Sequence, residues 1–140
     1  MTNDLRGLSE AIASLNRSLR RELELPLSVS SMSALATVAD HGPLRAGELA
    51  GREGIQPATL TRIIKVLTDN GFIDRIPDPQ DGRASLISLT HKGSETLTEA
   101  RRRRAAALEA RANNLSSHQR RQLAAAIPAL QELAHFSAER

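Results

Sequence analysis

The sequence contains no cysteine, which excludes disulfide bonds, cysteine-ligated zinc and thiol redox chemistry. Aromatic side chains are almost absent, because Phe72 and Phe136 are the only two and there is no tryptophan or tyrosine. Modules that bind RNA or single-stranded nucleic acid stack bases on aromatic side chains, so the composition counts against those classes. The core must consist of leucine, isoleucine, valine and alanine, which suits closely packed helices better than a large β-sandwich.

Long apolar runs are missing as well. No run approaches the roughly 20 residues that a membrane-spanning helix needs. The opening residues, MTNDLRGLSE, lack the charged-then-apolar order of a signal peptide. We therefore expect a soluble, cytoplasmic protein without a membrane partner.

The patterns of catalytic and metal sites are also missing. The histidines, His41, His91, His118 and His135, are scattered and follow no metal-ligand spacing. No Ser/His/Asp set, glycine-rich phosphate loop or pair of carboxylates stands out. We expect no enzymatic activity, no metal and no cofactor.

The net charge is small, +3, although the pI is near 10.5, so bulk charge alone does not indicate a nucleic-acid partner. The run Arg101–Arg104 is the most basic stretch. On a helix these side chains point in all directions around the axis, so we expect most of them to pair with acids such as Glu99 and Glu109. Some of them could add contacts to phosphates.

Apolar spacing and turn residues predict the elements. A leucine-rich stripe at helical spacing runs from Leu5 to Leu23, and Pro26 ends it. Caps and stops predict further helices at about 28–41, 45–52 and 57–70. The segments FIDRI and SLISL are expected to form a hairpin around the turn-rich PDPQDGR.

The C-terminal part is expected to be helical. Thr90 is the expected cap of a helix at about 91–113, and Ser116 with Gln119 forms a capping-box pair for another helix, which Pro128 should kink. The predicted fold class is mainly α with a small β-wing. One domain, 1–140, would contain a winged helix-turn-helix head at about 28–90 and a helical dimerisation region at about 1–25 and 91–138.

The helix at 57–70 has two contrasting faces. Leu60, Ile63, Ile64 and Leu67 fall on one side and should be buried. The opposite side mixes small residues, hydroxyls and cations, and small residues let a helix approach base edges closely. An ordinary solvated face would explain these residues alone, but the short preceding helix and tight turn favour DNA recognition. The expected DNA-binding residues of this helix are Gln56, Pro57, Ala58, Thr59, Thr61, Arg62 and Lys65.

The hairpin tip adds a second candidate contact. Asp78, Pro79 and Gly82 are turn formers, so the tip could be no more than a solvated turn. Its position directly after the helix at 57–70, the candidate recognition helix, favours a wing, in which Arg83 enters the minor groove. Asp81 would then orient the tip by accepting from Arg83 or from tip amides.

The terminal helices carry more apolar surface than a small head can cover. Burying one leucine contributes roughly 1.5–3 kcal/mol, so an exposed row would be costly. A two-fold homodimer is the favoured solution, and an intramolecular helix pair is the alternative. The expected dimerisation residues are Leu5, Leu8, Ile12, Leu15, Leu19, Leu123, Ile127 and Leu130.

The segment ELAGREGIQPATLTRIIKVLTDNGFIDRIPDPQDGRASLISLTHKG resembles the MarR (multiple antibiotic resistance regulator) family of transcription factors. Its most specific parts are ELA, LTRIIKVL with the following glycine, and DPQDGR before LISLTHKG. The flanking helices match in order and length. The resemblance implies an obligate homodimer that represses, or less often activates, nearby promoters. The two heads of such a dimer would bind half-sites of a pseudo-palindromic operator in double-stranded DNA. The resemblance maps the base-contacting helix to residues 56–65 and the wing arginine to Arg83, with Asp81 beside it.

The resemblance also implies a small-molecule effector, often a phenolic or other aromatic anion. An effector pocket would lie between the head and the dimerisation helices, and its residues are not assigned. Gly82 departs from the family, which often has a basic residue there, and Pro128 could reshape the dimerisation helices. Without cysteine, the peroxide-sensing branch of the family does not apply.

Two other functions compete with a ligand-released repressor. One is a winged-helix regulator without a ligand, controlled by its abundance or by a protein partner. The other is a helical module whose wing contacts protein. The combination of Arg62, Lys65 and the tip at Asp81 and Arg83 argues against the protein-binding helical module.

Overall fold

The computed structural model describes residues 2–136 and confirms a mainly helical chain with one small sheet. The elements in chain order are α1 (Thr2–Leu23), α2 (Val29–His41), α3 (Ala46–Glu53), α4 (Pro57–Asp69), β1 (Ile73–Pro77), β2 (Ser85–Leu89), α5 (His91–Ala112) and α6 (Ser117–His135). The chain divides into two compact units, Met1–Arg103 and Arg104–Arg140. Met1 and positions 137–138 of the expected dimerisation region lie outside the described residues.

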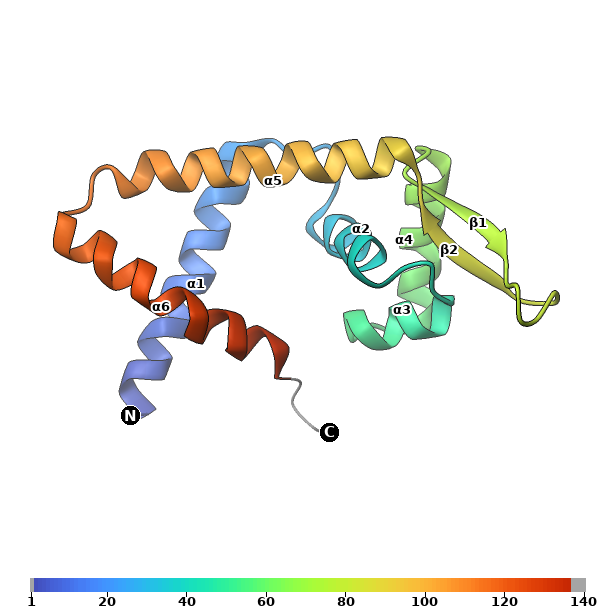
Figure 1. The fold of residues 1–140 in the computed structure, drawn as a ribbon, viewed down its shortest axis with the longest axis horizontal. Coiled ribbons are helices and arrows are strands. Elements are labelled where there is room, and N and C mark those ends of the chain that lie inside the picture. Colours follow the sequence, from blue (N-terminus) through green and yellow to red (C-terminus); the bar gives the residue numbers. More distant parts are fainter. Residues whose placement is uncertain (1, 137–140) are drawn as a thin grey trace. The chain divides into compact units, whose positions relative to one another are not determined.

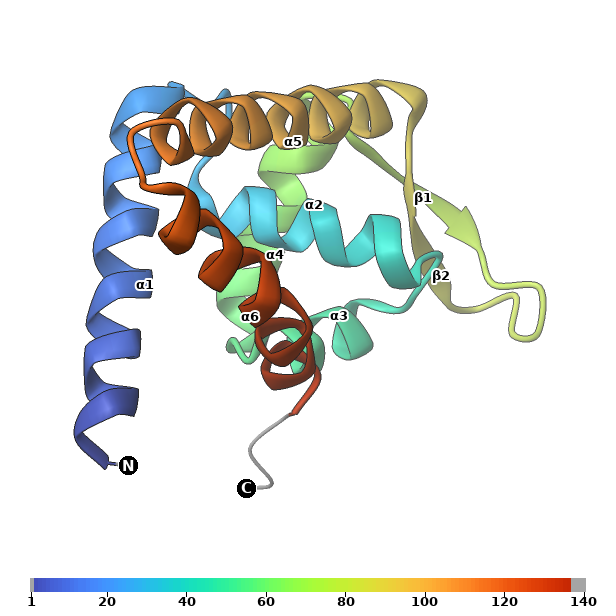
Figure 2. The same ribbon diagram turned by 60° about the vertical axis from the view of Figure 1, so that its left-hand side comes forward.

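The head is built around one hydrophobic core. Helix α2 packs crosswise against α4, and α3 contacts both (Figures 1 and 2). Leu97 joins the start of α5 to this core. The buried cluster also contains Ala34, Leu35, Val38, Leu44, Leu49, Ala50, Leu60, Ile63, Ile64, Leu67, Phe72, Ile73 and Ile87.

Caps and turns fix the ends of the head helices as the sequence predicts. The Ser28 side chain accepts from the backbone N–H of Ser31 at the start of α2. Gly54 takes the left-handed conformation, with φ of 64°, in the turn after α3. Pro57 occupies the first turn of α4, where its missing N–H costs nothing. Gly71 is left-handed, with φ of 75°, and turns the chain from α4 into the hairpin.

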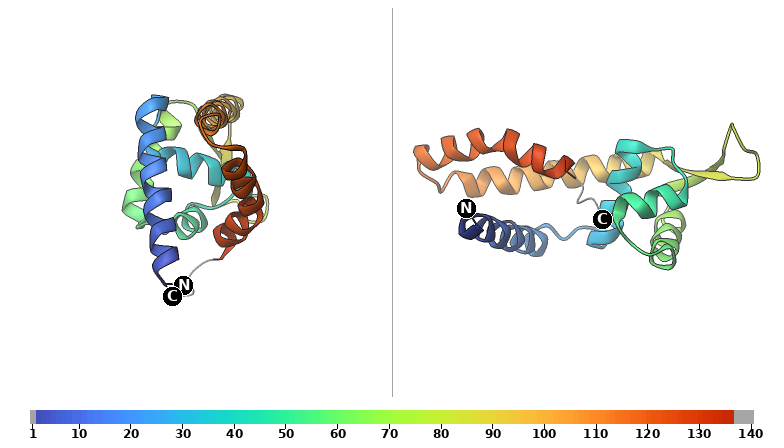
Figure 3. Two further views of the ribbon diagram at one scale, coloured as in Figure 1. Left: turned by 90° about the vertical axis from the view of Figure 1, so that its left-hand side faces the viewer. Right: turned by 90° about the horizontal axis from the view of Figure 1, so that it is seen from below.

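The wing is an antiparallel hairpin that projects away from the head helices (Figures 1 and 3). Its register pairs Ile73 with Leu89 and Pro77 with Ser85. Leu44, just before α3, adds an isolated bridge to Ile87, with hydrogen bonds in both directions of 3.2 and 2.8 Å. The hairpin therefore has a third, very short partner that belongs to the helical part of the head.

The start of α5 is bonded to the exit of α4. The Thr90 hydroxyl donates to the Gly71 carbonyl at 2.6 Å and accepts from the Gly93 N–H at 3.0 Å. A side chain at Gly93 could not fit, because its Cβ would lie 2.1 Å from the Phe72 carbonyl oxygen. Lys92 donates to the Asn70 carbonyl at 2.7 Å and lies 4.9 Å from the centre of the Phe72 ring. The motif LTHKG thus holds the recognition helix, the wing and α5 together at one point.

The second unit contains the end of α5 and all of α6. Ser116 and Gln119 form the expected capping box at the start of α6. The helix continues on both sides of Pro128, and none of its described residues is buried in the single chain. Large apolar side chains on α6, among them Leu123 at 53% and Ile127 at 51% exposure, therefore face solvent.

Helix α1 carries the other apolar stripe. Leu5, Ile12 and Leu15 are exposed, and Leu8 is half-buried. Leu19 departs from the expected interface set, because it is only 2% exposed and packs within its own chain. Among the described residues, no helix is both long and apolar enough to cross a membrane.

Candidate nucleic-acid interface

Helix α4 has the two faces that its sequence predicts. Leu60, Ile63, Ile64 and Leu67 are buried in the head core. The other side exposes the expected contact residues, with Thr59 half-buried at its edge. The exposed residues are Gln56, Pro57, Ala58, Thr61, Arg62 and Lys65. The buried face fixes the rotation of α4 about its axis, so this polar face cannot turn inward.

Two side chains on this face are engaged in hydrogen bonds within the helix. The Thr61 hydroxyl donates to the Pro57 carbonyl at 2.9 Å. The Lys65 ammonium lies 2.8 Å from an Asp69 carboxylate oxygen, and this hydrogen bond raises the pKa of Lys65. The Asp69 carboxylate therefore partly neutralises the charge that Lys65 could offer to a phosphate. Arg62 is exposed on the same face, and a guanidinium group is able to bond guanine bidentately.

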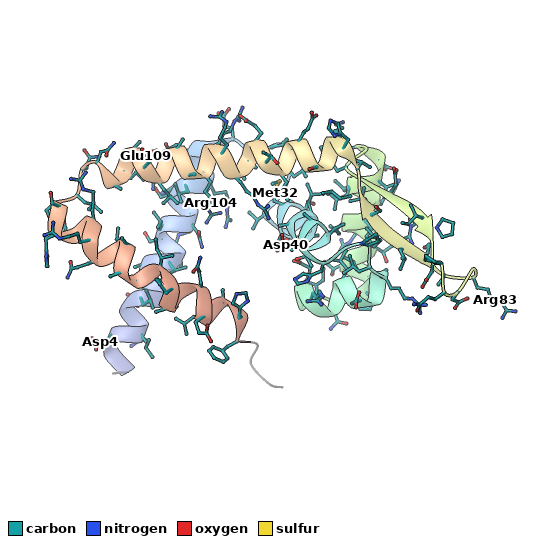
Figure 4. The ribbon with its side chains drawn as sticks, viewed as in Figure 1. Asp4, Met32, Asp40, Arg83, Arg104 and Glu109 are labelled. Atoms are coloured by element: carbon teal, nitrogen blue, oxygen red, sulfur yellow. The ribbon has the colours of Figure 1, made fainter. Side chains whose placement is uncertain are left out.

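The wing tip contains a local hydrogen bond between residues two positions apart. The Asp81 carboxylate accepts from the backbone N–H of Arg83 at 3.1 Å, which is the tip amide contact expected from the sequence. The Arg83 side chain is exposed and points away from the head (Figure 4). A single cation at the end of a thin hairpin suits insertion into a narrow groove.

The start of the wing tip contains an ion pair that the sequence patterns did not predict. Arg45, before α3, donates through Nε and Nη2 to Asp78 at 3.1 and 2.7 Å. Asp78 also accepts from the backbone N–H of Gln80 at 2.9 Å. The Gln80 N–H, with Arg45 second, lowers the pKa of Asp78. These contacts to the ionised Asp78 therefore stabilise the folded state above the ordinary aspartate pKa. Their contribution is lost only in acid, as the pH falls through the lowered pKa of Asp78.

Another missed network joins α2 to the end of α3. The hydroxyls of Ser33 and Thr37 both donate to the Glu53 carboxylate, Ser33 at 2.8 Å. An acid is unfavourable near a helix C-terminus, and these two donors offset that cost. They also fix the position of α3, against which α4 packs.

The arginine run on α5 is largely engaged in ion pairs, as the sequence analysis favours. Arg102 and Arg103 bind Glu99 at 2.8 and 3.1 Å, and Arg102, then Arg103, lowers the pKa of Glu99 to about 2. Arg101 lies 3.5 Å from Asp40 of α2, a partner that was not predicted. We therefore assign no DNA contact to these arginines.

The rest of the described chain offers no metal centre. Between residues 2 and 136, no group of three or more histidine, aspartate or glutamate side chains could hold a metal ion.

Comparison with known proteins identifies this architecture. Residues 27–85 match the sequence model of the MarR family. An uncharacterized HTH-type transcriptional regulator of Mycobacterium leprae, ML2140, is 44% identical over 114 residues, which cover 81% of this chain and 80% of that protein. The chain belongs to the MarR family. It is a DNA-binding transcriptional regulator and not an enzyme, and its hairpin and α3–α4 pair are the winged helix-turn-helix of that family.

Solved structures support the same fold. The regulator Tm0710 of Thermotoga maritima has a TM-score of 0.77 and 25% identity, over 95% of this chain and 94% of that one. The PcaV regulator of Streptomyces coelicolor, solved with its natural ligand, has a TM-score of 0.62 and 20% identity, over 91% of this chain and 92% of its own. At that identity the likeness to PcaV concerns the MarR fold alone.

The pair on α4 leads to a first prediction. Asp69→Asn should tighten binding to any duplex DNA by about two- to fivefold at low salt, because Lys65 is released and one charge that repels phosphate is lost. Affinity should be measured by fluorescence anisotropy on operator and random duplexes over a salt series. Glu10→Gln is the matched control, since Glu10 pairs with Arg6 at the same spacing on α1. An equal gain from Glu10→Gln would show that only net charge matters.

Proposed function

We propose that this MarR regulator acts as a homodimer that binds a pseudo-palindromic operator, represses the adjacent promoter and is released by a small ligand. The observation that carries this proposal is the head itself, which exposes Arg62 on α4 and Arg83 on the wing. These two elements suit the major groove and a neighbouring minor groove of duplex DNA.

In this proposal α4 lies in the major groove. At its start, the N-cap Gln56 and the helical residues Pro57 and Ala58 are exposed, and the small side chain of Ala58 lets the helix approach base edges. Arg62 reads a guanine, while Thr59, Thr61 and Lys65 contact phosphates or bases from the flanks. Arg83 enters the minor groove, and Asp81 keeps the tip in the conformation that presents it.

The apolar faces of the terminal helices support the dimer. On α6, Leu123, Ile127 and Leu130 are exposed in the single chain, and on α1 the same is true of Leu5, Ile12 and Leu15. Leaving these side chains in water would cost roughly 1.5–3 kcal/mol for each one that could be buried. A second copy offers the same faces in return, so a two-fold interface can cover them. Leu8 is half-buried and takes a smaller part in this interface.

The effector is proposed to bind a cavity of about 370 Å³ within the first unit. This volume is in the range of small-ligand sites. Leu25, Pro26 and Ala100 supply apolar lining, while Glu24, Glu95, Glu99 and Arg103 supply charge, and Thr96 completes the wall. A ligand here would contact both the connection before α2 and the helix that holds α4 through Thr90, so binding could alter the position of the recognition helix.

The dimer can be tested by sedimentation. Replacing Leu123 and Ile127 by glutamate should convert a dimer at micromolar concentration into a monomer, because charges would face each other across an apolar seam. Ala125→Glu, an exposed position on the same helix that lies opposite the apolar stripe, is the control. A wild-type chain that sediments as a folded monomer would overturn the proposal.

The DNA contacts can be tested on the operator, found by footprinting the region upstream of the regulator's own coding sequence. Arg62→Ala should relax the base preference at particular positions, by roughly 1–3 kcal/mol for a bidentate contact. Arg83→Ala should weaken specific binding without dissociating the dimer. Uniform weakening on every sequence would make Arg62 a phosphate contact, and equal affinity of wild type and Arg83→Ala would refute the wing assignment.

The effector can be tested with benzoate, phenol and benzylamine, which share a ring and differ in charge. At least one should dissociate the operator complex. The carboxylates of the cavity predict benzoate to be the weakest, in contrast to the aromatic anions that the family resemblance implies. Thr96→Phe should fill the cavity and abolish release while operator affinity is kept. Thr98→Phe, at an exposed position of α5 outside the cavity, should respond like wild type. Release that persists unchanged in Thr96→Phe would place the effector elsewhere.

A further inference from the structure

Helix α3 begins at a residue that is poorly suited to begin a helix. Arg45 is its N-cap, and its side chain makes no capping hydrogen bond. Serine, threonine, aspartate and asparagine are favoured at this position because they accept from the first free N–H groups, which an arginine cannot do. A cation is also unfavourable at the positive end of the helix dipole. Arg45 therefore does not serve the stability of α3, and its side chain is engaged elsewhere.

The guanidinium of Arg45 is directed to the wing. Nε and Nη2 both donate to Oδ2 of Asp78, at 3.1 and 2.7 Å. Oδ1 of Asp78 accepts from the Gln80 N–H, so both carboxylate oxygens are occupied. Asp78 is only 8% exposed. Of the two buried polar residues in the described part of the chain, Ser31 and Asp78, it is the one that carries a charge. Two hydrogen bonds from a guanidinium to a buried carboxylate fix the relative orientation of the two side chains as well as their distance.

This ion pair lies at the point where the wing tip leaves the sheet. Asp78 directly follows β1, and its N–H donates to the Ala84 carbonyl at 3.1 Å, which closes the loop that carries Asp81 and Arg83. On the other strand, Ile87 pairs with Leu44, the neighbour of Arg45. A two-stranded hairpin is marginally stable alone, so its direction depends on what its base is bonded to. Here β2 is bonded to Leu44 and the residue that follows β1 is bonded to Arg45, so the two sides of the hairpin are bonded to neighbouring residues before α3.

We propose that Arg45 is a positioning residue for DNA recognition, which sets the direction of the wing through Asp78 and so places Arg83 in the minor groove. The inference rests on the proposed wing contact and adds the residue that controls it. Arg45 acts through Arg83 and makes no DNA contact of its own in this role. The α3–α4 motif and the wing are thereby joined into one reading unit.

A double-mutant cycle tests this role in the full-length protein, with anisotropy on the footprinted operator. Arg83→Ala and Arg45→Ala should each weaken specific binding by about five- to thirtyfold, as expected for loss of one oriented arginine contact. The double variant should bind about as weakly as Arg83→Ala alone. Once the Arg83 side chain is absent, a change in the direction of the tip removes no further contact. In the Arg62→Ala background, by contrast, Arg45→Ala should retain its full effect.

The outcomes separate the two proposals. No effect of Arg83→Ala would refute the wing contact and this inference with it. A normal loss in Arg83→Ala with no effect of Arg45→Ala, or with effects that multiply in the double variant, would overturn the inference alone. Multiplying effects with a smaller salt dependence would identify Arg45 as a direct phosphate contact.

Asp78→Asn separates positioning from simple electrostatics, because the two predict opposite changes in DNA affinity. Loss of a negative charge near DNA should tighten binding, whereas loss of the Arg45 pair should weaken specific binding and erase the minor-groove part of a hydroxyl-radical footprint. Asp74→Asn, an exposed acid on the same hairpin, is the matched control and should not weaken binding. Arg45→Lys, which keeps one bond to Asp78, should recover part of the affinity, and circular dichroism melts check that each variant folds. Tighter specific binding in Asp78→Asn would overturn the positioning role.

Discussion

The whole interface depends on the burial of one face of α4. Leu60, Ile63, Ile64 and Leu67 are enclosed by α2, α3 and Phe72, so α4 can neither rotate nor slide without opening the core. Each buried aliphatic side chain contributes roughly 1.5–3 kcal/mol, which is large beside the energy of any single polar contact on the exposed face. The apolar core therefore determines which side chains of α4 are presented to DNA, and the identity of those side chains determines which contacts they can make.

The helices of the head, the wing and α5 converge where α4 ends. Gly71 permits the turn because its φ is positive, and Gly93 permits the close approach of α5 to the Phe72 carbonyl. The Thr90 hydroxyl bridges the two segments. A shift of α5 would thus be passed to α4 through bonded groups and would not be absorbed by a flexible loop. This junction gives the proposed effector cavity, which α5 partly lines, a physical route to the recognition helix.

Sequence periodicity predicted what depends on local spacing. The helix bounds, the buried face of α4, the caps at Ser28 and Ser116 and the hairpin all follow from patterns within a few residues. Pairing between distant positions left no such pattern. Arg45 and Asp78 are 33 positions apart, and the available signal was an arginine where a capping residue is expected. The burial of Leu19 was missed for a related reason, because a stripe shows which face is apolar and not which part of it the chain itself covers.

Charge pairing explains why a dimer would matter for this protein. Arg45 and Lys65 are held by carboxylates, so their charges are partly neutralised before the head meets DNA. Affinity for phosphates grows with the number of cations that replace counterions, so we expect one such head to bind duplex DNA weakly and with a shallow salt dependence. Joining two heads makes the second binding event intramolecular, which multiplies affinity only where both half-sites have the right spacing. Low charge in the head then favours specificity. A ligand would not need to mask any DNA contact to release such a dimer, because a change in the spacing of the two heads removes the second event.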